Sequence, residues 1–536
     1  MNMALYGVGP ATDRQWMIVD CGISFGDDSL PGIDVILPDI RFVKELGDAV
    51  HGIVITHAHE DHFGALIHIW DQMRLPVYAT AFVAGLIEAK CIAEPGAPKI
   101  PVQIVEQGDC IDVGPFNVTF IPVSHSIPEP NALAIRTEHG LVVHTGDWKL
   151  DQKPGIGKPT DVGAFKAMGK EGVLALVCDS TNAMREGDSP SEEHIAQTLD
   201  RIIAEAPERV AVTTFASNVA RVIAIAKAAK RADRQCVLSG RALLRFTEIA
   251  GELGYLDGLP SFLSEDEYGY LPRNKVVVIL TGTQGEPRAA LARVASGEHR
   301  KIRLSPGDLM VFSSRAIPGN EKNVNQILNN LAELGIKTIT DSDADVHVTG
   351  HPRRNELKKM YSWLQPKIAI PVHGEAMHLE AHLAFAKEQG VGQALRVRNG
   401  WMARLAPTAD TWDEFIAGRI YKDGRIVGDA DEVGVQRRRK LSFAGHVAVS
   451  VMLDQKRGEI HGTPQFVCNG LPACNVEGVP FEDLISDTIE SVTVSIPRAR
   501  RKDPAVVQEA IRRGIRSVVY QHWSKKPICD VMISTL

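Results

Sequence analysis

The sequence predicts an α/β protein made of two packed sheets, an inserted parallel-sheet module and a small α/β unit at its end. Three observations support this prediction. The first 185 or so residues read as many short strands with few helices between them. Strands and helices then alternate regularly from about 190 to 340. A polar stretch rich in Gly and Asp near 408–436 precedes a last α/β run. A chain of 536 residues is long enough for several domains.

The first region begins with an apolar strand at 16–19, followed by a long loop at 24–40 that is rich in Gly, Pro and Asp. Further short apolar runs recur, and two stretches between them have helical character. We expect strands at 52–56, 76–80, 102–106, 116–123, 132–137, 140–145 and 173–178, and helices at 63–74, 80–93 and 162–170.

The inserted module is predicted from strict alternation, which is typical of a parallel sheet with crossover helices. We expect strands at 209–215, 235–239, 275–281 and 308–313, and helices at 218–232, 241–253, 287–296 and 320–334. The segment 344–407 reads as strand, helix, strand, helix, strand. After 440 we expect strands at 445–453, 458–461, 491–495 and 528–534, and helices at 479–489 and 503–514.

The composition is that of a globular protein, with 44% hydrophobic and 23% charged residues. No apolar run approaches the roughly 18–20 residues of a membrane span. The first residues lack the features of a signal peptide. The eight cysteines form no CxxC pair, which fits a reducing cytoplasm. The net charge of −7 does not by itself indicate a nucleic-acid binder, although residues 431–536 are net basic at +3.

The densest group of metal-ligand residue types lies in Thr56-His57-Ala58-His59-Glu60-Asp61-His62, between an apolar strand and a helical stretch. Neutral imidazole and carboxylate are ligands that zinc and similar divalent ions prefer. A solvated loop would not need three imidazoles and a carboxylate within six residues. The spacing lets one His pair reach one ion and the following Asp-His pair reach a second.

Three further polar residues end apolar strands: Asp20, His125 and Asp147. Each alone is a weak signal, because a strand-end Asp is more often a turn or helix cap. In chain order, however, Asp, then HxHxDH, then His, then Asp resembles the four successive motifs of the metallo-β-lactamase superfamily of hydrolases. That resemblance implies that His57, His59 and His125 hold one metal, that Asp61 and His62 hold a second, that Asp147 bridges both, and that Asp20 orients the ligands.

Sequence motifs further along the chain indicate which group of the superfamily the chain resembles. Asp179 lies in Cys-Asp-Ser-Thr-Asn, His351 in Asp-Val-His-Val-Thr-Gly-His-Pro, and His373 in Ile-Pro-Val-His-Gly-Glu. With an α/β module inserted between Asp179 and His347, the chain resembles the β-CASP group and, within it, the ribonuclease J family. Supporting runs are His125–Pro128, Thr213–Asn218, Thr281–Pro287 and Ile317–Asn320. The implied fold is a metallo-β-lactamase αββα sandwich with an inserted β-CASP domain and a small C-terminal α/β domain.

The same resemblance implies roles for the later residues. His373 completes the second metal site, and His351 stands near the leaving oxygen with Asp179 orienting it or sharing its proton. A core or capping histidine is the alternative for His351. The stretch His347, Val348, Thr349, Gly350, His351 cradles a substrate phosphate. Ser217, Asn218, Ser314 and Arg315 line an RNA channel or, equally, have only strand-end roles.

Two departures from the family pattern stand out. The family's Gly-rich run before the first Asp, of the form GGxGEIGxN, is represented here only from Met1-Asn2-Met3, so the first sheet is expected to lack an edge strand. Arg315 stands where relatives often have a small residue. The basic runs Arg437–Lys440, Arg498–Lys502 and Arg512-Arg513 could contact RNA phosphates or form a solvated face.

The resemblance implies a cytoplasmic ribonuclease with two divalent ions, zinc first and manganese as the alternative. It would be a 5′-to-3′ exonuclease that prefers 5′-monophosphate ends and also cuts internally, in rRNA maturation and mRNA decay. Other hypotheses are a hydrolase of a small ester, lactone or thioester, and a non-catalytic RNA-binding subunit. We expect domains at 1–185, 186–343, 344–430 and 441–536, no membrane partner, and a homodimer or homotetramer formed through the last domain.

Overall fold

The computed structural model describes residues 1–536 except Asp28, Pro318 and Ile416. Pro318 belongs to the run Ile317–Asn320 and therefore lies outside the described residues. The chain divides into two compact units. The first comprises Met1–Ser24 and Pro38–Gly418, and the second comprises Phe25–Leu37 and Arg419–Leu536.

The first unit contains two sheets that pack face to face. One has the strand order β1-β2-β5-β6-β7, and the other has the order β19-β18-β12-β11-β10-β9-β8. The strands of the first are β1 (Ala4–Val8), β2 (Gln15–Val19), β5 (Val50–Val54), β6 (Val77–Ala79) and β7 (Val102–Ile104). Those of the second are β8 (Cys110–Val113), β9 (Phe116–Pro122), β10 (Asn131–Thr137), β11 (Gly140–His144), β12 (Val173–Asp179), β18 (Ile368–Val372) and β19 (Gln393–Ala394).

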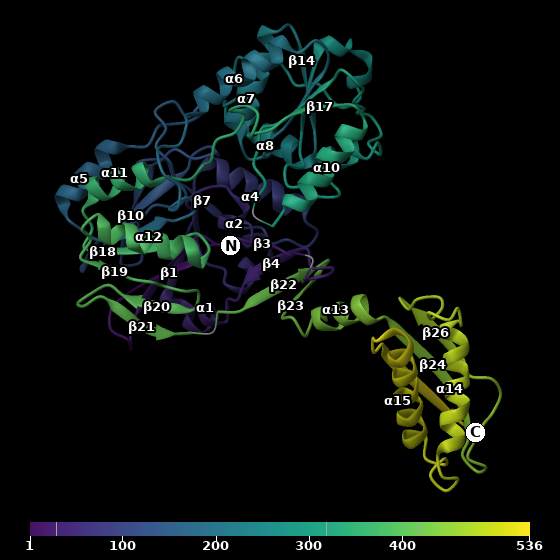
Figure 1. The fold of residues 1–536 in the computed structure, drawn as a ribbon. Helices are drawn as coiled ribbons and strands as arrows, with labels where there is room; N and C mark the ends of the chain where they lie inside the picture. Colours follow the sequence, from purple (N-terminus) through teal and green to yellow (C-terminus); the bar gives the residue numbers. More distant parts are fainter. Residues whose placement is uncertain (28, 318, 416) are drawn as a thin grey trace. The chain divides into compact units, whose positions relative to one another are not determined.

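Apolar side chains from both sheets fill the space between them. Met17, Val19 and Val54 come from the first sheet, and they share one buried cluster with residues of the second such as Phe120 and Ile370. The outer face of the second sheet is covered by three helices, α5 (Val162–Glu171), α11 (Arg354–Leu364) and α12 (Ala376–Glu388) (Figure 1). The predicted two-sheet sandwich with flanking helices is therefore confirmed.

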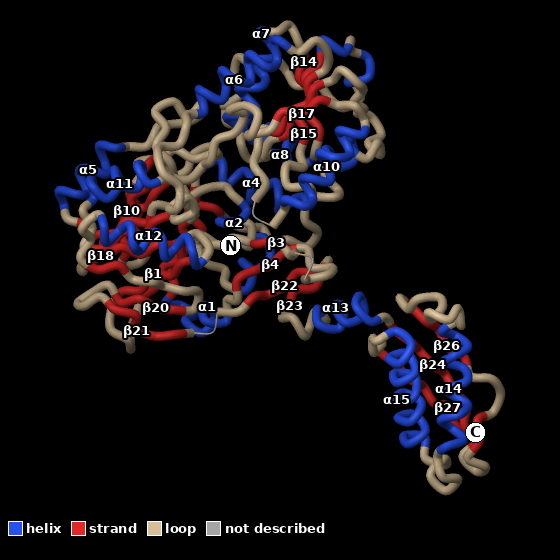
Figure 2. Tube along the Cα trace, in the orientation of Figure 1, coloured by secondary structure: helices blue, strands red, loops and turns tan. Residues whose placement is uncertain are grey.

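The inserted module is a three-layer α/β/α arrangement around a wholly parallel sheet of order β14-β15-β13-β16-β17 (Figure 2). One core cluster joins the sheet to helices α6 and α7, and another joins the opposite face to α9 and α10. The strands are β13 (Val210–Thr213), β14 (Gln235–Ser239), β15 (Val276–Leu280), β16 (Leu309–Phe312) and β17 (Lys337–Ile339). The helices are α6 (Glu192–Glu205), α7 (Val219–Arg231), α8 (Arg241–Glu252), α9 (Ala290–Ala295) and α10 (Glu321–Glu333).

Most predicted elements of this unit are confirmed within a few residues, and the exceptions have clear causes. The single helix expected at 63–74 is instead α2 (Glu60–Phe63), α3 (Leu66–Ile69) and a 3-10 turn at Trp70–Gln72. Helix α4 (Ala81–Ala93) and helix α1 (Arg41–Leu46) complete this part. The strand expected near 344–350 is a loop, because its backbone and side chains bind functional residues instead of a neighbouring strand.

The second unit contains a sheet of order β23-β22-β4-β3 and a separate C-terminal sheet. The long loop expected at 24–40 contributes β3 (Ser24–Phe25) and β4 (Val35–Pro38) to the former, beside β22 (Arg419–Asp423) and β23 (Ile426–Gly428). The first unit also has a hairpin of β20 (Trp401–Arg404) and β21 (Asp410–Glu414). Strand β4 has a weak sequence signal, since it is short and its partner β22 lies hundreds of residues away.

The C-terminal sheet places β24 (His446–Asp454) between β26 (Gln465–Asn469) and β27 (Ile528–Thr535), with β25 (Glu459–Ile460) beside it. Helices α14 (Phe481–Ser495) and α15 (Pro504–Trp523) bury their apolar side chains against one face of this sheet. Helix α13 (Val435–Ala444) precedes the sheet.

The strand predicted at 491–495 is wrong, because these residues form the last turns of α14. The β-branched run Val-Thr-Val favours a strand locally, but burial of Ile489 and Thr493 on the helix's inner side keeps it helical.

Two general features follow from the described residues. None of their helices has the length and apolar composition needed to cross a membrane. The eight cysteines are all free thiols.

Candidate active site

The candidate site is assembled where strands of the two packed sheets end. Asp20 directly follows β2 and has a left-handed backbone with φ of 64°, which turns the chain sharply at this point. The loop containing His57 and His59 follows β5 and runs into α2, which carries Asp61 and His62. His125 follows β9 and Asp147 follows β11, so residues distant in sequence meet at the carboxyl ends of strands.

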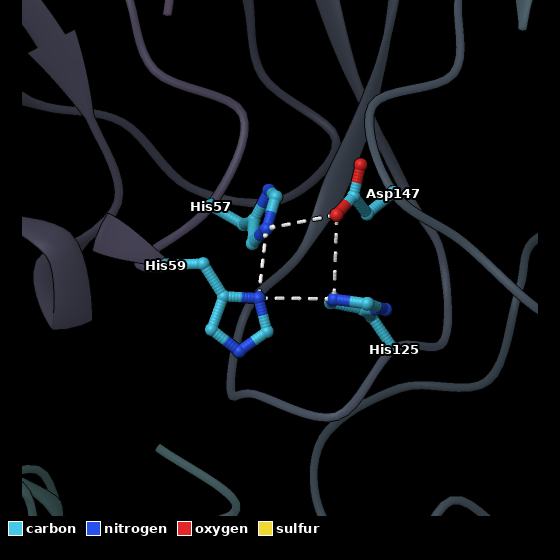
Figure 3. Close-up of side chains that lie close together, drawn as sticks. All are labelled: His57, His59, His125 and Asp147. Atoms are coloured by element: carbon cyan, nitrogen blue, oxygen red, sulfur yellow. Dashed lines mark hydrogen bonds and ion pairs between the residues drawn. The ribbon is translucent and has the colours of Figure 1, made fainter. Parts of the chain in front are cut away.

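One group comprises His57, His59, His125 and Asp147 (Figure 3). The Nδ1 atom of His59 lies 3.1 Å from His57 Nε2 and 3.0 Å from His125 Nε2. The Asp147 Oδ2 atom lies 3.8 Å from the Nε2 atoms of both His57 and His125. Four ligand atoms therefore lie close enough together to hold one metal ion.

A second group comprises Asp61, His62, Asp147 and His373. Asp147 Oδ2 lies 3.4 Å from His62 Nε2 and 3.5 Å from His373 Nε2. Asp61 Oδ2 lies 3.5 Å and 3.3 Å from the same two nitrogens. Since Asp147 belongs to both groups, the residues can hold two adjacent cations that share one carboxylate.

Each histidine of the two groups has its other ring nitrogen held by a neighbouring oxygen. Such contacts fix the tautomer and leave the inward nitrogen free to bind a metal. The contacts are His57 Nδ1 to Thr56 Oγ1 at 3.0 Å, His59 Nε2 to Ser217 Oγ at 3.1 Å, His125 Nδ1 to the Gly350 carbonyl at 2.6 Å, His62 Nδ1 to Asp20 Oδ2 at 2.7 Å and His373 Nδ1 to Thr181 Oγ1 at 2.8 Å.

The electrostatics of the site favour bound cations. In the part of the chain that the structure describes, the ion-pair partners of Asp61, Asp147 and Asp179 are all histidines. The Asp147 Oδ1 atom is buried and, among the described residues, has no hydrogen-bond donor. An uncompensated buried carboxylate is costly unless a cation or donor meets it. The residues therefore fit divalent metal ions.

The pKa values follow the same pattern. Burial lowers the pKa of His59 to about 4 and holds the pKa of His57 and His125 well below the usual value, so these imidazoles are neutral and can bind metal. Burial opposes charge on His62, but the carboxylates led by Asp147 outweigh it and raise its pKa to about 10. In the protein without metal, protons on His62 therefore offset charge that cations would otherwise offset.

Asp179 and His351 form a pair at the edge of this cluster. His351 Nδ1 lies 2.7 Å from Asp179 Oδ2, and the two rings of His351 and His373 stack with centroids 5.3 Å apart. Burial disfavours charge on His351, yet the adjacent Asp179 carboxylate raises its pKa above the usual value. Because Nδ1 faces Asp179, the Nε2 atom is the one free to exchange a proton with a substrate.

The stretch 347–351 runs from the inserted module to the site, and its residues have different surroundings. Val348 is buried in the core of the inserted module, and burial lowers the pKa of His347 to about 3. Thr349 Oγ1 accepts hydrogen bonds from Asn182 Nδ2 and the His351 amide. A Cβ added to Gly350 would lie 2.5 Å from the His125 ring, so this close approach requires glycine.

The four predicted channel residues are placed differently from one another. Ser217 contacts the metal-site residue His59. Asn218 is buried, and its side chain caps α7 by accepting from the Arg221 amide at 3.0 Å. Ser314 is buried after β16, and the guanidinium of Arg315 pairs with Asp341.

Sequence reasoning did not identify four residues that hold the ligands. Thr56 and Thr181 orient His57 and His373, and Asn182 holds Thr349. Asn2 places its side-chain Nδ2 atom 3.0 Å from both Asp61 Oδ2 and His62 Nε2. Thr56 and Thr181 directly adjoin the recognised motifs, so their position was the available signal.

Family models match four parts of the chain in order. Residues 15–167 match the beta-lactamase superfamily domain, and residues 207–331 match the ribonuclease J beta-CASP domain. Residues 344–394 match the Zn-dependent metallo-hydrolase RNA specificity domain, and residues 433–536 match the ribonuclease J C-terminal domain.

Similar proteins extend this match over the whole chain. A protein named ribonuclease J from Sinorhizobium meliloti is 54% identical over 535 residues, which covers 100% of this chain and 95% of that protein. The chain belongs to the ribonuclease J family. Other members are a Corynebacterium glutamicum ribonuclease J at 38% identity, covering 96% of this chain and 72% of that protein, and a Helicobacter pylori ribonuclease J at 33%, covering 96% and 75%.

The fold is also similar to a solved structure of a protein of unknown function from Enterococcus faecalis. Its TM-score is 0.51 at 17% identity, and the match covers 73% of this chain and 94% of that chain. The ribonuclease J family fold is thus a metallo-β-lactamase sandwich with an inserted β-CASP domain and a C-terminal domain.

Proposed function

We propose that this protein is a metal-dependent ribonuclease that hydrolyses RNA phosphodiesters with two bound divalent ions, zinc first and manganese as the alternative. One observation carries the proposal. Two groups of His and Asp ligand atoms share Asp147, and the His351–Asp179 pair stands directly beside them. A pair of cations with an adjacent proton donor is the arrangement that phosphodiester hydrolysis needs.

His57, His59, His125 and Asp147 would hold one ion, and Asp61, His62, His373 and Asp147 the other. When bound, the ions supply an activated water and neutralise charge on the phosphoryl oxygens. The chain's own groups hold the ligands in place through Asp20, Thr56 and Thr181. Asp179 would stabilise the protonated imidazolium of His351, which would then deliver a proton from Nε2 to the leaving oxygen and become neutral.

The products of this chemistry are a 5′-phosphate and a 3′-hydroxyl. We propose 5′-to-3′ exonuclease action with a preference for 5′-monophosphate ends, together with internal cleavage, in rRNA maturation and mRNA decay. Membership of the ribonuclease J family supports this proposal. Thr349 and Gly350, beside His351, would face the substrate phosphate, where a hydroxyl and a backbone amide suit an anion.

We propose that the chain has four domains with different roles: 1–185, 186–343, 344–430 and 441–536. The first and third supply ligands, the second covers the RNA, and the last joins copies into a homodimer or homotetramer. A match to the ribonuclease J C-terminal domain supports a separate last domain. The eight free cysteines support a cytoplasmic location.

The test uses one internally labelled RNA prepared with either a 5′-monophosphate or a 5′-triphosphate, incubated with and without a chelator. We expect mononucleotides to be released faster from the monophosphate RNA, and only without chelator. Discrete internal fragments from both RNAs would instead indicate an endonuclease. Failure to cleave either RNA while two metals are bound would favour the small-ester hydrolase or the non-catalytic RNA-binding subunit.

A further inference from the structure

Ser217 links the inserted module to the metal cluster. This serine lies in the loop between β13 and α7, whereas His59 lies in the loop after β5. Its Oγ atom is 3.1 Å from His59 Nε2. Among the contacts that hold the five cluster histidines, this is the one that comes from the module's sheet-and-helix layers.

The contact determines which nitrogen of His59 can bind a metal. His59 Nδ1 faces His57 Nε2 and His125 Nε2 at 3.1 Å and 3.0 Å. With Nε2–H donated to the Ser217 hydroxyl, the proton stays on Nε2 and the Nδ1 lone pair points to the metal position. His57 and His125 use the opposite nitrogen, so His59 needs its own support for this tautomer.

The loop that contains Ser217 is held in place by hydrogen bonds and by a buried ion pair next to it. The Asn218 carboxamide caps α7, and the amide of Val219 donates to the Ser217 carbonyl at 2.9 Å. One turn later, the fully buried guanidinium of Arg221 contacts Glu192 Oε2 at 2.8 Å and the carbonyl of Val346 at 2.9 Å. Val346 leads into the stretch 347–351. The loop that carries Ser217 is thus anchored to the start of α7, and Arg221 of that helix is tied to α6 and to the segment before 347–351.

We propose that Ser217 is a positioning residue for the metal ligand His59, so that metal binding and closure of the β13–α7 loop onto the site favour each other. The inference rests on the metal site of the proposed function. Outer contacts of this kind typically change metal affinity by about 10- to 100-fold. Thermodynamic linkage requires the reciprocal effect, so bound metal must stabilise the loop by the same factor.

A direct contact between Ser217 and RNA is the competing interpretation. A serine that only binds RNA would alter RNA affinity and leave the affinity for metal unchanged. A serine that supports His59 would alter metal affinity in the absence of any RNA. The two interpretations therefore separate in a measurement made without substrate.

The experiment measures zinc affinity of the full chain by competition with a chromophoric chelator, without RNA. We expect Ser217→Ala to weaken one of two bound zinc ions about 10-fold, and Ser217→Thr, which keeps the hydroxyl, to restore most of the affinity. Ser314→Ala is the matched control, because its side chain makes no hydrogen bond to a cluster histidine among the described residues, and it should bind zinc as the original chain does.

Hydrogen exchange supplies a second readout, and its first comparison uses only the original chain. In the original chain, zinc should slow amide exchange in residues 214–219, and in Ser217→Ala this protection should be lost. Zinc affinity of Ser217→Ala equal to that of the original chain, or no zinc-dependent protection of this loop, would overturn the inference while leaving the proposed function intact. An original chain that binds no zinc or manganese would instead overturn the proposed function.

Discussion

His351 Nδ1 and Asp179 Oδ2 lie 2.7 Å apart, although 172 positions of the chain separate the two residues. Asp179 is completely buried at the end of β12, and the His351 side chain is 20% exposed. The carboxylate therefore fixes the ring through Nδ1 and leaves Nε2 for contact with a substrate. The site therefore has two parts: the candidate metal ligands, and the His351–Asp179 pair that can carry a proton.

Replacing His351 by Ala should slow RNA cleavage by about 10²- to 10⁴-fold, because a positioned general acid is lost. Metal analysis of the same preparation should still find two ions per chain. Asp179→Asn is the companion variant. It keeps a hydrogen-bonding group but removes the charge that raises the pKa of His351, so the alkaline side of the pH–rate profile, where the general acid loses its proton, should move to lower pH. Loss of an ion in His351→Ala would make His351 a metal ligand instead.

Asp61→Ala should abolish cleavage, because Asp61 Oδ2 lies within 3.5 Å of both histidines of the second group. Bound metal measured by mass spectrometry of the native protein should fall from two ions to one. Affinity for a 5′-monophosphate RNA should remain close to that of the original chain. Full activity in this variant would contradict the two-metal mechanism.

Asn2 should support the second metal group, since its side chain approaches both Asp61 Oδ2 and His62 Nε2 at 3.0 Å. The segment is held there by its backbone as well, with the Asn2 amide donating to the Asp61 carbonyl at 2.8 Å. Figure 1 shows the N-terminus beside α2. We expect Asn2→Ala to weaken the second ion about 10-fold in a chelator competition assay.

The control for Asn2 is Gln15→Ala, because Gln15 is a polar residue of β2, the strand paired with β1, and its side chain contacts His51, outside the cluster. Its metal affinity should not change. Equal affinity in Asn2→Ala and Gln15→Ala would show that Asn2 has no part in the second site.

Arg221→Ala should destabilise the protein by about 3–5 kcal/mol, because it removes the closer of the two cations that pair with the buried Glu192 carboxylate and leaves Lys149 at 3.7 Å. Both side chains are almost inaccessible, with 0% and 4% exposure. Arg231→Ala is the matched control from the same helix, since its pair with Asp200 is exposed and should cost less than about 1 kcal/mol. Denaturant unfolding followed by circular dichroism compares the two. Similar midpoints would mean that the buried ion pair does not stabilise the fold.

The buried histidine His382 should make stability fall on acidification. It bridges Ser180 Oγ and the Tyr361 hydroxyl at 2.9 Å each, and burial lowers its pKa from 6.5 to about 4. Between these values the unfolded chain binds more protons than the folded one, so stability rises with pH there. The neutral ring's contribution is complete above about pH 6.5 and is lost as the pH falls toward about 4.

The size of this effect is roughly 2 kcal/mol between about pH 7 and pH 5. Unfolding midpoints at both pH values, in the presence of excess metal, measure it. In His382→Gln, which does not titrate, the difference between the two pH values should shrink by about that amount. An unchanged difference would mean that His382 is already protonated in the folded protein near pH 5.

Much of the fold was predictable because its signals are local. Runs such as 173–178 are continuously apolar and become central strands. In amphipathic helices such as 320–334, the spacing of the apolar residues identifies the side of the helix that is buried. Elements that depend on distant partners were not predictable in this way. Strand β4 pairs with β22, some 400 positions away, and the β-branched run 491–495 stays helical through its packing.

The sequence by itself determined the chemistry of the site. Five histidines and the carboxylates Asp20, Asp61, Asp147 and Asp179 were identifiable because their motifs, many of which follow apolar strands, resemble in chain order those of the ribonuclease J family. Tertiary structure decided which nitrogen of each imidazole faces the cluster. That choice depends on oxygen atoms of Ser217, Gly350 and Thr181, which come from elements far apart in the chain and meet only when the sheets and the inserted module pack together.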